Sequence, residues 1–155
     1  MPIRPAAIPD RPRRSFLGFL YEPVVTGKET GGAYELHLFG GPAGHAPPPH
    51  VHSREDEAFY VLQGVFEIGV DGKTHRLGPG GYIHLPRDVP HSFRIAGERD
   101  GRCLLWVFPA TLEGFFAALS RPLPRGTDRP LPVTDEDVGK LMKIAPEYGI
   151  TILPA

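Results

Sequence analysis

The sequence predicts an all-β domain, a sandwich or a barrel, followed by two C-terminal helices. Short strand-like runs recur between residues 15 and 108, and turn signals separate them. The 155-residue chain has 19 glycines and 19 prolines, which suit many tight turns. After Phe108 the alternating patterns give way to helical spacing. We therefore expect a flexible N-terminal arm over residues 1–14, a β-barrel over residues 15–108 and a helical extension over residues 109–155 that packs on it.

The predicted strands follow one another at nearly regular intervals. Residues 15–26 hold one or two strands, and the mostly apolar run over residues 33–39 holds the next. The later strand-like runs occupy residues 57–63, 65–70, 73–77, 81–86, 91–96 and 103–108. The pair Asp71-Gly72 between two alternating runs is a strong hairpin signal.

Two amphipathic helices are expected in the extension. The first has Thr111 as its N-cap and an apolar stripe made of Leu112, Phe115, Phe116 and Leu119. A proline-rich connector over residues 121–133 separates the helices. The second helix starts at the acidic segment 134–137 and has a stripe made of Val138, Leu141, Met142 and Ile144.

Composition and charge exclude some kinds of partner. Seventeen basic and 18 acidic side chains give a net charge of −1, so there is no electrostatic case for binding nucleic acid or an anionic membrane. Cys103 is the only cysteine, so it cannot form an internal disulfide. No run reaches the roughly 18 apolar residues of a membrane-spanning helix. A cytoplasmic location is the resulting expectation.

Four residues with metal-ligating side chains stand out. His50 and His52 are two residues apart, so on a strand both imidazoles point to the same face. Glu57 follows after a short polar turn, and His91 lies further along the chain. Three imidazoles and one carboxylate suit one divalent transition metal with open coordination positions: Fe, Mn, Ni, Co or Cu, with Zn as a further option. Glu55 and Asp56 are expected to be solvated turn residues, although either carboxylate can replace Glu57 as a ligand.

The spacing of these residues resembles the first motif of the cupin family. That motif is a glycine, five residues, His-x-His, three or four residues, a glutamate, six residues and a glycine. The segment from Gly44 to Gly64 matches it at every fixed position. The resemblance covers residues 33–108 and implies a double-stranded β-helix, the jelly-roll barrel, with His50, His52, Glu57 and His91 as metal ligands.

The second cupin motif is matched in part. Gly80, Pro86 and His91 occupy three of its fixed positions. Asp88 stands where the motif has its second glycine, and Ile95 stands where it has an asparagine. The histidine is the ligand in this motif, so the implied metal site is intact.

Strand parity predicts which side chains line a pocket above the metal. If Glu57 points inward, Phe59 shares its face, and Phe93 shares the face of His91 in the same way. Tyr34 and Leu36 share one face of the early strand, and Phe115 closes the mouth from the first helix. Each of these residues also suits ordinary core packing. A pocket built from them is largely apolar.

Within the family the chain is most similar to small bacterial proteins of the quercetin dioxygenase-like group. The similarity lies in Pro48-Pro49-His50-Val51-His52, in the run from Asp56 to Leu62 and in the segment 147–150. It implies a homodimeric enzyme that takes a small aromatic or enolic substrate and dioxygen, with Glu57 as general base. Another metal-dependent enzyme, an isomerase or a hydrolase, and a non-catalytic metal or small-ligand binding protein remain open.

Overall fold

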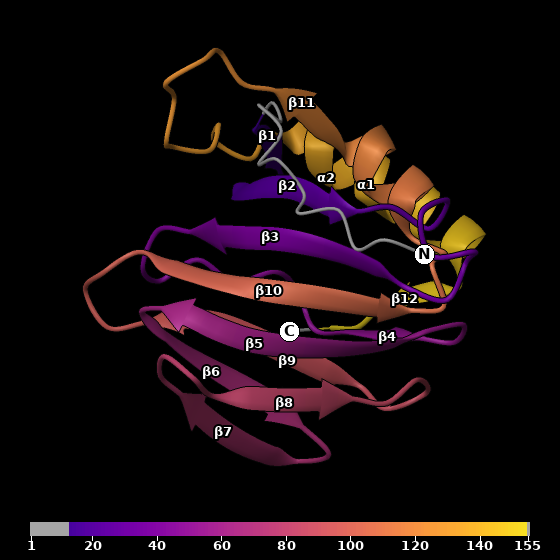
Figure 1. Cartoon of the computed structure of the whole chain (residues 1–155), viewed down its shortest axis with the longest axis horizontal. Helices are drawn as coiled ribbons and strands as arrows, with labels where there is room; N and C mark the ends of the chain where they lie inside the picture. The colour runs from indigo at the N-terminus through magenta and orange to yellow at the C-terminus, as the bar shows by residue number, and fades with distance from the viewer. Residues whose placement is uncertain (1–12, 155) are drawn as a thin grey trace, which may run out of the picture.

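Two antiparallel β-sheets packed face to face make up most of the molecule, and two helices lie at one end of them (Figure 1). The structure is a computed structural model that describes residues 13–154. One sheet has the strand order β11 (Ser120–Pro122), β1 (Arg14–Phe16), β2 (Phe19–Val25), β3 (Glu35–Gly41), β10 (Gly101–Phe108), β5 (Asp56–Gln63) and β8 (Tyr82–Leu85). The other has the order β12 (Ile150–Ile152), β4 (His50–His52), β9 (His91–Ala96), β6 (Val65–Val70) and β7 (Lys73–Leu77).

The chain passes back and forth between the two sheets from β3 to β10, as in a jelly roll. β3, β5, β8 and β10 belong to the seven-stranded sheet, and β4, β6, β7 and β9 belong to the five-stranded sheet. The predicted all-β class and jelly-roll architecture are therefore confirmed.

The ends of the described chain complete both sheets. The predicted arm over residues 1–14 lies outside the described residues except for Arg13 and Arg14, and Arg14 already opens β1. The extension after residue 109 is not purely helical, because β11 pairs with β1 and β12 pairs with β4. Strands of three residues are too short for an alternating pattern, so the sequence does not reveal these two.

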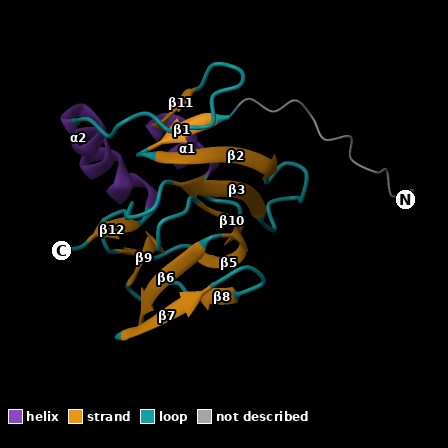
Figure 2. Cartoon of the chain, turned by 90° about the vertical axis from the view of Figure 1, so that its left-hand side faces the viewer, coloured by secondary structure: helices purple, strands orange, loops and turns teal. Residues whose placement is uncertain are grey.

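The two helices are α1 (Glu113–Leu119) and α2 (Asp135–Ile144), and a 3₁₀ turn, η1 (Ala145–Tyr148), follows α2. Figure 2 shows them on one side of the sheets. Thr134 caps α2 through a reciprocal pair of hydrogen bonds with Asp137. The prediction that Thr111 caps α1 is wrong: the cap position is Leu112, whose own side chain cannot cap, and its backbone N–H donates to the carboxylate of Glu35. Among residues 13–154, no helix combines the length and the apolarity needed to cross a membrane.

The core fills the space between the sheets and under α1. Its aromatic members include Phe16, Phe19, Phe39, Phe59, Phe93, Phe115 and Phe116. On β3 the inward side chains are Glu35, His37 and Phe39, all buried, whereas Leu36 and Leu38 are only partly buried on the opposite face. The prediction that Leu36 lines a pocket is therefore wrong, because the other face of β3 points inward.

Candidate metal centre

Four side chains from three strands converge inside the barrel. His50 and His52 come from β4, and His91 comes from β9. Glu57 faces them from β5 in the opposite sheet. One ligand atom from each residue lies within 4.8 Å of those of the other three. Oε2 of Glu57 is 3.2 Å from Nε2 of His91 and 3.6 Å from Nε2 of His52. The sequence-predicted set is thus brought together in one place.

Backbone pairing explains why the histidines meet. His50 pairs directly with His91 between β4 and β9, and His52 lies two residues further along β4 on the same face. The turn before β9 is joined to β4, because the N–H of Asp88 donates to the carbonyl of His52 at 2.7 Å. Asp88 has φ +66°, the left-handed conformation that favours glycine. The aspartate therefore keeps the backbone shape of the glycine that it replaces in the second motif.

The hydrogen bonds of the three rings favour metal binding through Nε2. Nδ1 of His50 lies 2.9 Å from the carbonyl oxygen of Pro48, and Nδ1 of His91 lies 3.4 Å from that of Val89. Nδ1 of His52 lies 2.6 Å from Oε1 of Glu55. Carbonyl and carboxylate oxygens only accept, so each Nδ1 carries the proton and each Nε2 keeps its lone pair. Nε2 of His52 and Nε2 of His91 are buried without a hydrogen-bond partner, as ligand atoms for an ion would be.

Electrostatics keep the carboxylate of the cluster ionised. Burial acts to raise the pKa of Glu57, but the neighbouring His52, His91 and His50 outweigh it and lower that pKa to about 2. Burial and the two other imidazoles lower the pKa of His50 to about 4, which leaves this ring neutral at pH 7. For His52, burial acts to lower the pKa, yet Glu57 and Glu55 raise it overall. A divalent ion would bind His52 in its neutral form, because a proton and a metal ion compete for the same ring nitrogen.

Glu55 departs from the sequence expectation, whereas Asp56 remains partly exposed. Glu55 was predicted to be a solvated turn residue, which is wrong: it is 1% exposed. It bonds to His52 and to Thr111, which lies 56 residues away in sequence, so no local pattern signals its burial. Asp56 points away from the cluster and pairs with Arg87 and His84.

An apolar cavity of about 80 Å³ is lined by three of the metal candidates, His50, His52 and Glu57. Phe59, Phe93 and Phe115, all predicted to line a pocket, contribute to its wall. Other apolar walls come from Phe16, Phe19, Phe39, Leu105, Leu112, Phe116, Leu141, Ile150 and Ile152. Tyr34 and Leu36 are absent from this wall, because Leu36 lies on the outer face of β3 and the ring of Tyr34 packs near that of Phe108. Sequence parity could not identify the inner face of β3, since both faces carry apolar residues.

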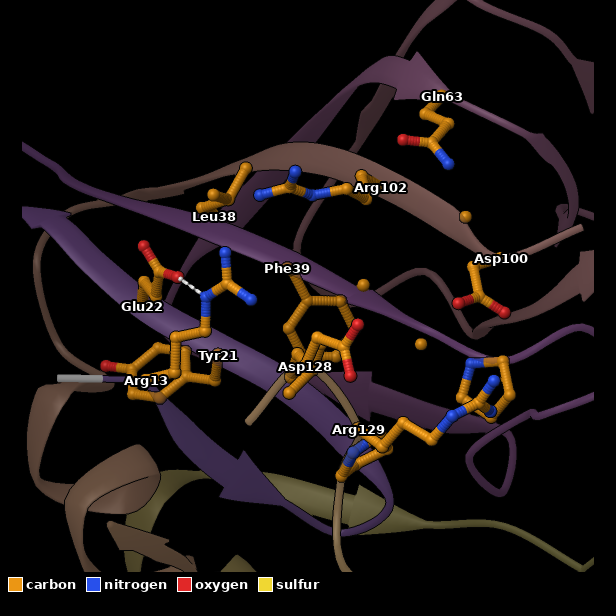
Figure 3. Close-up of a pocket in the computed structure, with 16 residues that line it drawn as sticks. Arg13, Tyr21, Glu22, Leu38, Phe39, Gln63, Asp100, Arg102, Asp128 and Arg129 are labelled. Atoms are coloured by element: carbon orange, nitrogen blue, oxygen red, sulfur yellow. Dashed lines mark hydrogen bonds and ion pairs between the residues drawn. The ribbon is translucent and has the colours of Figure 1, made fainter. Parts of the chain in front are cut away.

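A second cleft, of about 320 Å³, lies on the outer side of the seven-stranded sheet (Figure 3). Its charged side chains are Arg13, Glu22, Asp100, Arg102, Asp128 and Arg129, and Arg13 pairs with Glu22 at 2.8 Å. Basic and acidic groups are balanced, and none of the four metal candidates lines this cleft. Three of the metal candidates line the smaller apolar cavity instead.

Comparisons with known proteins agree with this site. A family model described as Cupin domain matches residues 38–108. Quercetin 2,3-dioxygenase of Bacillus subtilis (strain 168) is 30% identical over 99 residues, which are 64% of this chain and 29% of that protein. The chain therefore spans less than a third of the length of that relative.

Two further proteins match over more of their own length. The protein named Polyketide synthase CurC of Streptomyces cyaneus is 27% identical over 134 residues, 85% of this chain and 85% of that protein. A solved structure, a predicted oxalate decarboxylase of Thermotoga maritima, superposes with a TM-score of 0.60 at 18% identity, covering 64% of this chain and 94% of that one. The latter likeness supports the jelly-roll fold.

Proposed function

Because the chain belongs to the cupin superfamily, we propose that it is a metal-dependent dioxygenase that cleaves a flavonol or a similar enol or phenol. One observation carries this proposal: three of the four metal candidates, His50, His52 and Glu57, line a cavity with aromatic walls. Flat rings suit such walls, since aromatic pairs favour stacked and edge-to-face contacts. The dioxygenase relatives at about 30% identity support the same substrate class.

Different residues of the chain would bind the ion, accept the proton and hold the substrate. His50, His52, His91 and Glu57 would hold one divalent ion, which when bound supplies Lewis-acid activation of a coordinated hydroxyl group. Glu57 accepts the hydroxyl proton of the substrate as general base. Its pKa of about 2 makes it a weak base, so this transfer would depend on a bound ion that makes the coordinated hydroxyl group more acidic. Phe59 and Phe93 hold the ring against the cavity wall and exclude water. For a flavonol, both oxygen atoms of dioxygen enter the ring-opened ester and the hydroxyl-bearing carbon leaves as carbon monoxide, so no external reductant is needed.

Oxygen uptake tests this proposal. Metal-free protein is reloaded separately with Mn, Fe, Co, Ni, Cu and Zn, and quercetin is added in an oxygen electrode while its absorbance is followed. Uptake with one redox-active metal and none with zinc is the expected result. Glu57→Gln should abolish turnover while retaining part of the metal. Stoichiometric loading without uptake by any of the metals would reject the flavonol substrate.

In a second candidate function, the chain acts on a polyketide. The match to the Streptomyces protein named as a polyketide synthase extends over 85% of both chains, much further along the relative than the match to the bacterial dioxygenase. The aromatic wall suits stacking against a polycyclic phenol, but the cavity of about 80 Å³ would have to widen to admit one. The assay uses 1,8-dihydroxyanthrone in place of quercetin, with spontaneous oxidation subtracted. Enzymatic conversion of this compound without conversion of quercetin would favour the second function.

The active form in this proposal is a homodimer that pairs through the outer side of the seven-stranded sheet. Six side chains form what we name the outer apolar face: Leu36, Leu38, Tyr60, Tyr82, Leu104 and Trp106. They are cross-strand neighbours on β3, β10, β5 and β8. None of these six is charged, and Tyr60 and Tyr82 are 38% and 57% exposed, which favours the pairing of two identical faces through these side chains. A cytoplasmic location also stays a prediction.

A further inference from the structure

Two buried carboxylates hold the residues that precede α1. Oε2 of Glu55 accepts a hydrogen bond from Oγ1 of Thr111 at 2.5 Å. Oε1 of Glu35 accepts one from the backbone N–H of Leu112 at 3.2 Å. Glu55 is 1% exposed and Glu35 is 0% exposed. Because α1 begins at Glu113, both contacts anchor the same end of the helix.

Only one of the two carboxylates also touches the metal centre. Oε1 of Glu55 lies 2.6 Å from Nδ1 of His52, whereas the nearby ionisable partner of Glu35 is His37, at 3.4 Å. His37 is not among the metal candidates. Glu55 therefore forms a continuous link from His52 through its carboxylate to Thr111, and Glu35 holds the same helix end without such a link.

The helix at the end of this link forms part of the cavity wall. Leu112, Phe115 and Phe116 line the cavity that three of the metal candidates also line. Phe115 and Phe116 are buried and pack against Phe16 from β1, with ring centroids 5.8 and 4.9 Å apart. A rotation of the His52 ring must move Glu55 or break its bond, and a moving Glu55 carries Thr111 with it. The geometry connects the orientation of one ligand to the aromatic wall.

We propose that Glu55 is a positioning residue that holds His52 in its ligating orientation and couples metal occupancy to the packing of α1. The proposal rests on the metal centre of the proposed function. A carboxylate cannot donate a hydrogen bond, so Nδ1 of His52 must carry the proton and Nε2 keeps its lone pair toward Glu57. The second oxygen of the same carboxylate is occupied by Thr111, which limits how far the carboxylate can rotate.

The positioning role is tested with Co(II) as the probe on the full chain. Dissociation constants come from chelator competition, and the visible spectrum of bound Co(II) reports the ligand geometry. Loss of a hydrogen-bond partner behind a ligand typically costs 10–100-fold in metal affinity. We expect Glu55→Ala to lose affinity in that range with an altered spectrum, and Glu55→Gln to lose about tenfold, since glutamine keeps the shape but not the charge.

Glu35→Gln is the matched control, because it changes a buried carboxylate at the same helix end that does not contact a ligand. It should bind Co(II) within threefold of the unmodified chain. Nitrogen-15 spectra of metal-free protein should show His52 protonated at Nδ1, and Glu55→Ala should mix the two tautomers. Equal affinity and an unchanged spectrum in both Glu55 variants would overturn the role. If Glu55→Ala folds poorly, Glu55→Gln decides the question alone, because glutamine has the same shape as glutamate.

Coupling to α1 is tested by amide hydrogen exchange with and without Co(II). In the unmodified chain we expect loading to slow exchange over residues 113–119. Thr111→Val should still bind Co(II) but lose this slowing, whereas Thr134→Val, which removes the cap of α2, should keep it. Equal slowing in Thr111→Val would overturn the coupling. An unmodified chain that binds no Co(II) would reject the metal centre itself, which separates that failure from a failure of Glu55 alone.

Discussion

Nε2 of His91 lies 3.2 Å from Oε2 of Glu57, although His91 belongs to the five-stranded sheet and Glu57 to the seven-stranded sheet. The two atoms face each other across the interior of the barrel. An ion held by both residues would therefore join the two sheets. Because the four candidates meet only in the folded chain, such an ion stabilises the folded state by binding it selectively.

Metal loading should accordingly raise the melting temperature. At a free concentration 100 times Kd, an ion that binds only the folded state adds about 2.7 kcal/mol, which is roughly 5–11 °C for a domain of this size. Calorimetry of metal-free and Mn(II)-loaded protein measures the gain. His91→Ala should abolish it, and His75→Ala, at an exposed position on β7, should keep it. The same gain in His91→Ala would mean that the ion binds elsewhere.

Asp56 should contribute stability that depends on pH. Hydrogen bonds from the backbone and side chain of Arg87, with a smaller contribution from His84, lower the pKa of Asp56 to about 2. In the unfolded chain an aspartate titrates near pH 3.9, so the contribution is present above about pH 4 and is lost as the pH falls through about 2. Asp56→Asn should lower the free energy of unfolding at pH 7 by at most about 1 kcal/mol, because the ion pair is partly solvated.

Urea unfolding between pH 7 and pH 2 checks this window. The difference between Asp56→Asn and the unmodified chain should shrink steadily below pH 4. Asp71→Asn, at the exposed turn between β6 and β7, is the control and should stay close to the unmodified chain throughout. A difference that is constant with pH would contradict an electrostatic origin.

The left-handed backbone at Asp88 leads to a third prediction. Asp88→Gly should unfold within about 0.5 kcal/mol of the unmodified chain, because glycine adopts φ +66° freely but loses more entropy on folding. Asp88→Ala should be less stable by about 1 kcal/mol, since alanine adopts the left-handed conformation less readily than aspartate does. Chemical denaturation of the two variants measures the order, and an alanine variant as stable as the glycine variant would contradict the argument.

Local patterns were sufficient to predict most of the barrel and the ligand set. The runs that became β5, β6, β7 and β9 carry clear strand signals, and Asp71-Gly72 between two of them forms the expected turn. His50, His52 and Glu57 are close in sequence, so the motif spacing alone places them near one another. The second motif identifies His91 as the fourth metal candidate, and its pairing with His50 agrees with that assignment.

Tertiary contacts decide what the sequence could not. Leu36 and Leu38 are as apolar as the inward Phe39, so the inner face of β3 is chosen by packing and not by alternation. That choice buries Glu35 and His37, which a sequence pattern would assign to solvent. The burial of Glu55 depends on Thr111, and this same bond removes Thr111 from the helix cap predicted for it.

Self-association should depend on the outer apolar face. Light scattering at micromolar concentration should give twice the mass of one chain. Tyr60→Arg places a charge in the middle of this face and should give monomers, because two identical faces would then repel each other. Leu131→Arg is the matched control: Leu131 is 40% exposed, close to the 38% of Tyr60, but lies on the connector before α2. A monomeric unmodified chain, or dimers in Tyr60→Arg, would reject this interface.

Phe93 should affect substrate binding in addition to folding. Its ring packs against Phe19, Phe39 and Phe59 in the cavity wall, with centroids 5.3–5.9 Å apart. Phe93→Leu keeps an apolar side chain of similar size but removes the aromatic face. An aromatic contact is worth about 0.5–1.5 kcal/mol, so we expect KM for the aromatic substrate to rise roughly two- to tenfold, with kcat changed less.

Phe66→Leu separates this effect from a loss of stability. Phe66 is fully buried between the same sheets but does not line the cavity. Both leucine variants should lose up to about 1.5 kcal/mol of folding free energy, so their melting temperatures should fall together. Only Phe93→Leu should raise KM. If both variants raise KM equally, the change reflects a loosened core, and Phe93 has no direct contact with the substrate.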